Sequence, residues 1–172
     1  MIIKDAEYHR IYRVWSGIKQ RCYDKNDKSY GSYGGKGVTV APEWMNFGNF
    51  YKWYIANKYE CDDKLVMDKD ILGGEIYSPE TCLLIPEHIN FSLPKKKRDT
   101  RHTTGVQRRG KMFEVKVRDN GVNTYIGTYK TLEAASSVYI KCKNELYQAM
   151  IDEYAGKMPD HTFKTLKAYS YE

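Results

Sequence analysis

Apolar residues near the N-terminus recur at steps of three and four, which is typical of an amphipathic helix with one buried face. They are Tyr8, Ile11, Tyr12, Trp15, Ile18 and Cys22. A glycine-rich segment over residues 31–37 predicts a turn, and the β-branched residues 38–40 after it predict a short strand. Asn46 is suited to cap a second helix, whose aromatic stripe of Phe47, Phe50, Tyr51 and Tyr54 we expect in the core.

Residues 65–93 predict strand, loop, strand and helix. The strands cover residues 65–70 and 77–85, and Pro86 is placed in the first helical turn, where its missing N–H costs nothing. A strand that ends in a carboxylate, beside a helix with a second oxygen ligand, can hold a hard divalent cation such as Mg²⁺. Asp68 and Asn90 are the candidate metal ligands. The alternative is that Asp68 merely caps a turn, together with Asp70.

Residues 105–129 predict a three-stranded antiparallel sheet. Phe113, Val115 and Val117 alternate with polar residues, which indicates a strand with one buried face. The pair Asn120-Gly121 is a strong hairpin signal. We expect Thr131 to cap a helix that covers the apolar face of the sheet. The opposite face would present side chains that can contact phosphates and base edges: Gln107, Arg109, Lys116, Arg118, Asn123 and Tyr125.

Charge is distributed unevenly along the chain. The net charge is +6, and residues 1–93 carry 12 Lys and Arg against 13 Asp and Glu, so the excess lies in residues 94–172. That half begins with a basic run after Pro94, which predicts a linker over residues 94–103 between domains 1–93 and 104–172. The run is either a solvated tail or a phosphate-binding arm. Its cations are Lys95, Lys96, Lys97 and Arg98.

Composition excludes several classes of protein. Its 16 tyrosines argue against disorder, and 172 residues suffice for a core without disulfides. No apolar run approaches the roughly 20 residues that span a bilayer, and no export signal is visible, so we expect a cytoplasmic location. The four cysteines show no zinc-knuckle or redox spacing, and we expect reduced thiols. The predicted fold class is α+β.

The N-terminal half resembles phage HNH homing endonucleases. The resemblance covers about residues 8–93 and is carried by Trp15 to Tyr23, Tyr33 to Val38, Glu43-Trp44, Met67 to Asp70 and Tyr77 to Cys82. It implies a ββα-metal module that binds Mg²⁺ or Mn²⁺. By position, Asp68 and Asn90 match the metal ligands of the family. Lys69 occupies the position of the family's general-base histidine, and Thr81 occupies the position of its central asparagine.

These replacements affect the expected mechanism. A histidine with a pKa of about 6.5 can accept a proton at neutral pH, whereas a lysine near 10.4 is already protonated. Lys69 is therefore a poor base, although it could bind a phosphate as a point charge. General-base catalysis contributes roughly 10²–10⁴-fold, so its loss would leave a slow nuclease or none. His88 is about 160° around a regular helix from Asn90 and is an unsuitable substitute.

Residues 104–135 closely resemble the plant ethylene-response-factor type of DNA-binding domain, which is also found appended to phage HNH endonucleases. The residues that carry the resemblance are Thr104 to Val106, Phe113 to Asp119, Tyr125 to Tyr129 and Thr131 to Ala135. It implies that the sheet lies in the major groove. Gln107, Asn123 and Tyr125 replace family arginines and a tryptophan, so the family's target sequence does not carry over.

Three functions are compatible with these features. One is a two-module DNA endonuclease or nickase, which would cut both strands only as a homodimer. The second is a nuclease-inactive descendant that binds double-stranded DNA as a transcriptional regulator or a competitor for the site. The third is a single-stranded nucleic-acid binder that stacks bases on exposed tyrosines, which leaves Asp68 and Asn90 unexplained.

Overall fold

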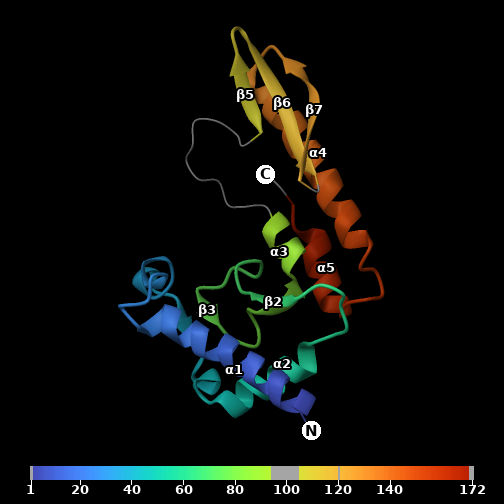
Figure 1. The fold of residues 1–172 in the computed structure, drawn as a ribbon. Helices are drawn as coiled ribbons and strands as arrows, with labels where there is room; N and C mark the ends of the chain where they lie inside the picture. Colours follow the sequence, from blue (N-terminus) through green and yellow to red (C-terminus); the bar gives the residue numbers. More distant parts are fainter. Residues whose placement is uncertain (1, 94–104, 120, 171–172) are drawn as a thin grey trace. The chain divides into compact units, whose positions relative to one another are not determined.

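The computed structural model describes residues 2–93, 105–119 and 121–170, and its elements form a mixed α+β fold (Figure 1). The chain divides into two compact units. The first contains Met1–Asn90 and Lys157–Thr162, and the second contains Phe91–Gly156 and Phe163–Glu172. The predicted linker over residues 94–103 lies outside the described residues.

The first unit begins with the predicted amphipathic helix, α1 (Ile2–Tyr23). The apolar face of α1 is buried at Ile11, Ile18 and Cys22, as the apolar spacing predicts. The expectation that Tyr8 and Tyr12 are also buried is wrong, because they are 43% and 45% exposed. Both rings lie at the edge of the stripe and contact the Phe47 ring, each with a centroid separation of 5.1 Å.

The glycine-rich segment forms two short 3₁₀ turns, η1 (Tyr30–Ser32) and η2 (Gly34–Lys36), before the strand β1 (Thr39–Val40). Gly34 is required here, because a Cβ at this position would overlap the carbonyl oxygen of Cys22. A further 3₁₀ turn, η3 (Pro42–Met45), leads into α2 (Phe47–Asn57). The predicted cap is confirmed: Asn46 Oδ1 accepts a hydrogen bond from the Gly48 amide at 2.8 Å.

Two antiparallel strands and a helix follow α2 along the chain: β2 (Leu65–Asp68), β4 (Leu83–Pro86) and α3 (Glu87–Ser92). The prediction of one strand over residues 77–85 is wrong. A turn at residues 78–82 separates β4 from β3 (Ile76–Tyr77), which pairs in parallel with β1. Pro86 ends β4, and the helix starts one residue later than expected.

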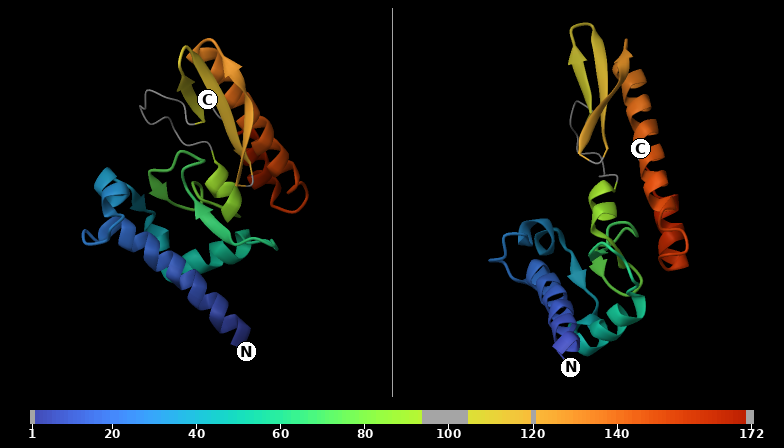
Figure 2. Two further views of the ribbon diagram at one scale, coloured as in Figure 1. Left: turned by 45° about the horizontal axis from the view of Figure 1, so that its top comes forward. Right: turned by 45° about the vertical axis from the view of Figure 1, so that its right-hand side comes forward.

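The second unit contains the predicted three-stranded sheet, with β5 (Val106–Arg109), β6 (Met112–Asp119) and β7 (Val122–Tyr129) in antiparallel order. The helix α4 (Leu132–Asp152) lies along one face of the sheet (Figure 2). Val115, Val117 and Ala135 form the centre of the core between them. The Thr131 hydroxyl caps α4 by accepting from the Ala134 amide, as predicted.

Gly105 allows the chain to pass close beneath this helix. Its φ of +88° is left-handed, and a Cβ there would overlap the Tyr139 ring. After α4 the chain forms α5 (Asp160–Ala168), and the Tyr147 hydroxyl on α4 donates a hydrogen bond to the Leu166 carbonyl at 3.2 Å.

All four cysteines are free thiols, and Cys22 and Cys82 are buried. In the part of the chain that the structure describes, no helix has both the length and the apolar character needed to cross a bilayer.

Candidate nucleic-acid interface and candidate metal centre

The sheet of the second unit has an outer face, which we define as the face opposite α4. Residues paired across antiparallel strands point to the same side. Val106 pairs with Val115 in the core, so the next pair, Gln107 with Glu114, points outward. The same alternation places all six predicted interface residues on this outer face: Gln107, Arg109, Lys116, Arg118, Asn123 and Tyr125.

A register shift modifies the pairing of β6 with β7. Val115 pairs with Gly127 and Lys116 with Tyr125, which leaves Ile126 as an extra residue on β7. As a result, Tyr125 and Thr128 both lie on the outer face although they are three residues apart. Their hydroxyls are 2.8 Å apart, and this hydrogen bond orients the Tyr125 ring, which is 56% exposed.

The outer face also carries an acid that the sequence interpretation did not include. Glu114 Oε1 lies 2.8 Å from Lys116 Nζ and 3.8 Å from Arg109 Nε. The Lys116 contact is an ion pair rather than a well-directed hydrogen bond. The ammonium of Lys116, together with Arg109, lowers the pKa of Glu114. The alternation that placed Lys116 on this face also places Glu114 there, so the sequence did contain the signal.

Arg109 connects two strands of this face. Its Nη2 donates to Gln107 Oε1 at 3.3 Å, while its Nε faces Glu114. The side chains are thus held in a polar network rather than extended freely into solvent. The basic residues predicted as a phosphate-binding arm, Lys95, Lys96, Lys97 and Arg98, lie outside the described residues.

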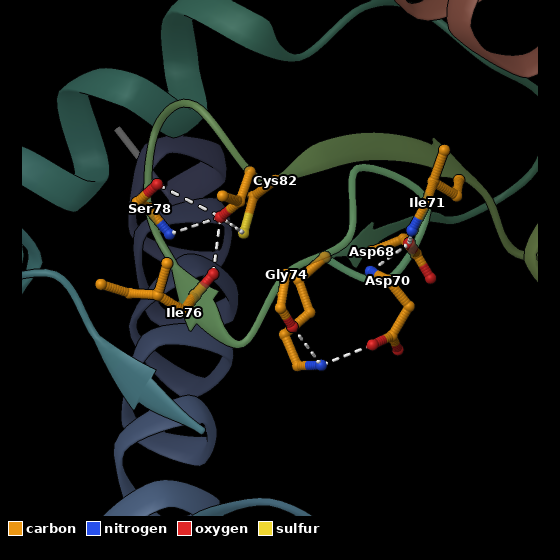
Figure 3. Close-up of polar contacts among 9 residues, drawn as sticks. Asp68, Asp70, Ile71, Gly74, Ile76, Ser78 and Cys82 are labelled. Atoms are coloured by element: carbon orange, nitrogen blue, oxygen red, sulfur yellow. Dashed lines mark hydrogen bonds and ion pairs between the residues drawn. The ribbon is translucent and has the colours of Figure 1, made fainter. Parts of the chain in front are cut away.

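In the first unit, Asp68 ends β2 and is 9% exposed (Figure 3). Its Oδ1 accepts hydrogen bonds from the backbone amides of Asp70 and Ile71, at 2.8 and 2.9 Å. These contacts are those of a turn cap. Burial raises the pKa of Asp68 despite these hydrogen bonds. Its second oxygen, Oδ2, has no hydrogen bond to any residue that the structure describes.

Lys69 is buried, with 6% of its surface exposed. Its Nζ lies 2.5 Å from Asp70 Oδ1 and donates to the Gly74 carbonyl at 3.0 Å (Figure 3). The Lys69 side chain therefore stabilises the loop between β2 and β3 by contacting two of its residues. Nζ thus directs its N–H groups at two oxygen acceptors, and these contacts are those of a donor rather than of a base.

Thr81 has a structural role in the next turn. Its Oγ1 donates to the Ile76 carbonyl at 2.6 Å and accepts from the Ser78 amide at 3.1 Å. Pro79 supplies no N–H inside this turn, and the side-chain bonds of Ser78 and Thr81 replace a strand ladder. This explains why the predicted strand over residues 77–85 is interrupted.

Asn90 lies on α3 and is partly buried, and in the part of the chain that the structure describes no hydrogen bond joins it to Asp68. On the same helix, His88 faces Asp63. Asp63 Oδ2 is 2.7 Å from His88 Nδ1 and accepts from the His88 amide at 3.0 Å. These hydrogen bonds lower the pKa of Asp63 to about 2.

The donor atoms fit a magnesium-type ion better than a zinc-type ion. Among the described residues, no three His, Cys, Asp or Glu side chains are grouped so that they could hold a metal. Zinc is usually held by three or four such ligands, whereas Mg²⁺ is held by one or two carboxylates and several waters. Asp68 Oδ2 is one oxygen that could contact such an ion.

Comparison with known proteins gives no assignment. No family model matches the chain, and no curated protein and no solved structure matches it significantly.

Proposed function

We propose that this protein binds double-stranded DNA in a sequence-specific manner through the outer face of the β5-β6-β7 sheet. The observation that carries the proposal is the common orientation of Gln107, Arg109, Lys116, Arg118, Asn123 and Tyr125 on that face. The resemblance of this segment to ethylene-response-factor domains points to the same surface. The apolar residues of the sheet are covered by α4, so the outer face is available to a partner within this unit.

The dimensions of the sheet support this proposal. The two edge strands of a three-stranded sheet are about 10 Å apart, since neighbouring strands are 4.7–4.9 Å apart. The major groove of B-DNA is about 12 Å wide and accepts a β-ribbon. A three-stranded face with one central strand is therefore of the right size to lie in or over that groove.

The chemistry of the face suits base reading as well as phosphate binding. Arginines such as Arg109 and Arg118 can donate two hydrogen bonds to guanine, and amides such as Asn123 can pair with adenine. Glu114 can accept from the cytosine amino group, a contact that phosphate-only binding would not use. Phosphate contacts position a protein, and base contacts give it specificity.

A second candidate function is metal-dependent nicking of DNA. It is favoured by the order of two antiparallel strands followed by a helix, β2, β4 and α3, and by the free oxygen of Asp68. Asp68 and Asn90 would hold Mg²⁺ or Mn²⁺, which would polarise the phosphodiester. Lys69 would contribute charge and loop structure but no general base. The alternative is a nuclease-inactive descendant that acts as a transcriptional regulator or competes for the DNA site. Such a protein would keep the binding face but would not cleave DNA.

The test of binding is selection of duplexes from a random library by the full-length protein. The proposal predicts enrichment of a defined sequence, and its duplex should then compete with random DNA. Failure to enrich any sequence would contradict specific binding. Single-stranded binding through exposed tyrosines predicts instead that excess duplex fails to displace a labelled single strand.

Nicking is tested on supercoiled DNA with Mg²⁺ or Mn²⁺, with and without chelator. Nicked product that requires metal and disappears in Asp68→Asn supports the nuclease. Retention of DNA in a gel shift without product, under either metal, supports the inactive descendant.

A further inference from the structure

The first unit contains a cavity of about 380 Å³ between α1 and β2 that the proposed function does not use. Its wall carries the basic side chains Arg13, Arg21 and Lys64 and the acid Asp27. Lys64 already pairs with Glu87 at 2.7 Å, so the two arginines carry the excess of positive charge. Asp27 Oδ1 is already occupied by the Ser29 amide, at 2.7 Å. The cavity therefore presents an excess of positive charge to any ligand that enters it.

Arg21 is the unusual member of this group. Its Nε is buried and has no hydrogen-bond partner, and no described carboxylate lies within ion-pair distance of its guanidinium. The guanidinium is held over the Tyr33 ring, with its central carbon 4.9 Å from the centroid. Buried donors almost always have a partner, so the guanidinium of Arg21 lacks an acceptor that a protein would normally supply.

The shape of the helix surface leaves room for such an acceptor. Gly17 lines the cavity between Arg13 and Arg21, and a Cβ added there would meet no atom within 4 Å. Positions 13, 17 and 21 are four residues apart, so they lie on one face of α1. Arg13 and Arg21 thus lie one turn before and one turn after a helix position without a side chain.

We propose that this cavity is a phosphate-binding site, with Arg21 and Arg13 as its main donors. A guanidinium fork matches two oxygens of a phosphate, and such charge-assisted pairs are stronger than neutral hydrogen bonds. The phosphate could belong to a nucleic-acid backbone or to a free phosphate or small phosphorylated molecule, and the chemistry of the site is the same. The site is in the first unit, so the proposal does not depend on DNA binding by the sheet.

The test follows the Arg21 Nε–Hε resonance by NMR in the full-length protein, identified by its absence from Arg21→Lys. Inorganic phosphate is titrated at constant ionic strength against chloride, and a short random-sequence duplex is titrated in parallel. A shift with inorganic phosphate identifies a free-phosphate site, and a shift with the duplex alone identifies a backbone site. No shift with either would overturn the proposal.

Matched variants separate a site from general charge attraction. Arg13→Gln should weaken binding of whichever phosphate ligand moves the resonance by about tenfold. Arg10→Gln is the control, because Arg10 is on the same helix but pairs with Glu7 and does not line the cavity. Equal loss in both variants would overturn the proposal. If Arg21→Lys does not fold, the resonance is assigned instead by through-bond correlations in the wild type, and Arg13→Gln still tests the site because Arg13 is exposed.

The result of the phosphate titration does not depend on whether the sheet binds DNA. Arg109→Ala, measured with the same duplex, reports on the outer face alone. If Arg109→Ala changes nothing while the Arg21 resonance moves, the proposed function fails and the phosphate site stands. The reverse result removes the phosphate site and leaves the proposed function.

Discussion

The carboxylate of Glu114 lies 2.8 Å from the ammonium of Lys116, in the middle of the outer face of β6. If the outer face binds DNA as proposed, a negative charge at this position would repel the phosphates and hold a cation that could otherwise contact them. Glu114 should then lower the affinity for DNA in general and favour a sequence that offers a donor such as the cytosine amino group. In such a complex Glu114 would contribute specificity at a cost in affinity.

Replacement of Glu114 by Gln tests this role. We expect Glu114→Gln to bind random-sequence duplex about three- to tenfold more tightly, with a salt dependence steeper by about 0.9 in log–log slope if Lys116 gains one phosphate contact. Fluorescence anisotropy at several salt concentrations measures both quantities. Unchanged affinity and slope would show that Glu114 does not face the DNA.

Thr81 gives a prediction about stability. Thr81→Val keeps the shape of the side chain but leaves the Ile76 carbonyl and the Ser78 amide without their partner, so we expect a loss of about 1–3 kcal/mol in unfolding free energy. Urea denaturation measures it. Thr124→Val, at an exposed strand position, is the control and should change stability by less than about 0.5 kcal/mol. Equal effects would contradict the structural role of Thr81.

The elements that depend on local pattern were predictable from the sequence. The apolar spacing predicted α1, and Asn46 and Thr131 marked the starts of α2 and α4. The strict alternation in β6 and the turn signal after it predicted the three-stranded sheet. In each case, residues close in the chain determine the structure.

Features that depend on particular side-chain contacts, rather than on the spacing of apolar residues, were not predictable. The burial of Lys69 requires the Gly74 carbonyl and the neighbouring tyrosine rings, which no spacing reveals. The break between β3 and β4 depends on hydroxyl bonds within a turn that follows Pro79. Tyr8 and Tyr12 fit the helical period, but only the position of Phe47 decides how far they are covered.

Asp68 is expected to reduce the stability of the fold at neutral pH. Burial raises its pKa above 3.8, so its stabilising contribution is greatest when it is protonated and falls as the pH rises through the folded-state pKa. Asp68→Asn keeps an Oδ1 acceptor for the Asp70 and Ile71 amides and removes the buried charge. We expect it to be more stable than the wild type at pH 7, as measured by thermal and urea unfolding. Lower stability would show that the charge itself supports the loop.

Asp63 has the opposite dependence on pH. The His88 hydrogen bonds lower its pKa to about 2 from 3.8, so its contribution is present above pH 3.8 and is lost as the pH falls towards 2. Asp63→Asn should therefore lose stability less steeply than the wild type over this range, as followed by urea midpoints. Asp62→Asn is the neighbouring control and should follow the wild type. Identical profiles for wild type and Asp63→Asn would contradict the assignment.

The central claim, that the outer face of the sheet contacts DNA, is tested most directly by two adjacent arginines. Both arginines are on β5. Arg109 points to the outer face, whereas Arg108, which pairs with Phe113 of β6, points to the face covered by α4. Both are exposed, so neither alanine variant removes a core residue. The measurement is the equilibrium affinity of each variant for the selected duplex at one salt concentration. We predict that Arg109→Ala weakens binding by at least about tenfold and Arg108→Ala by no more than about twofold. Equal effects of the two substitutions, or none from Arg109→Ala, would contradict the claim.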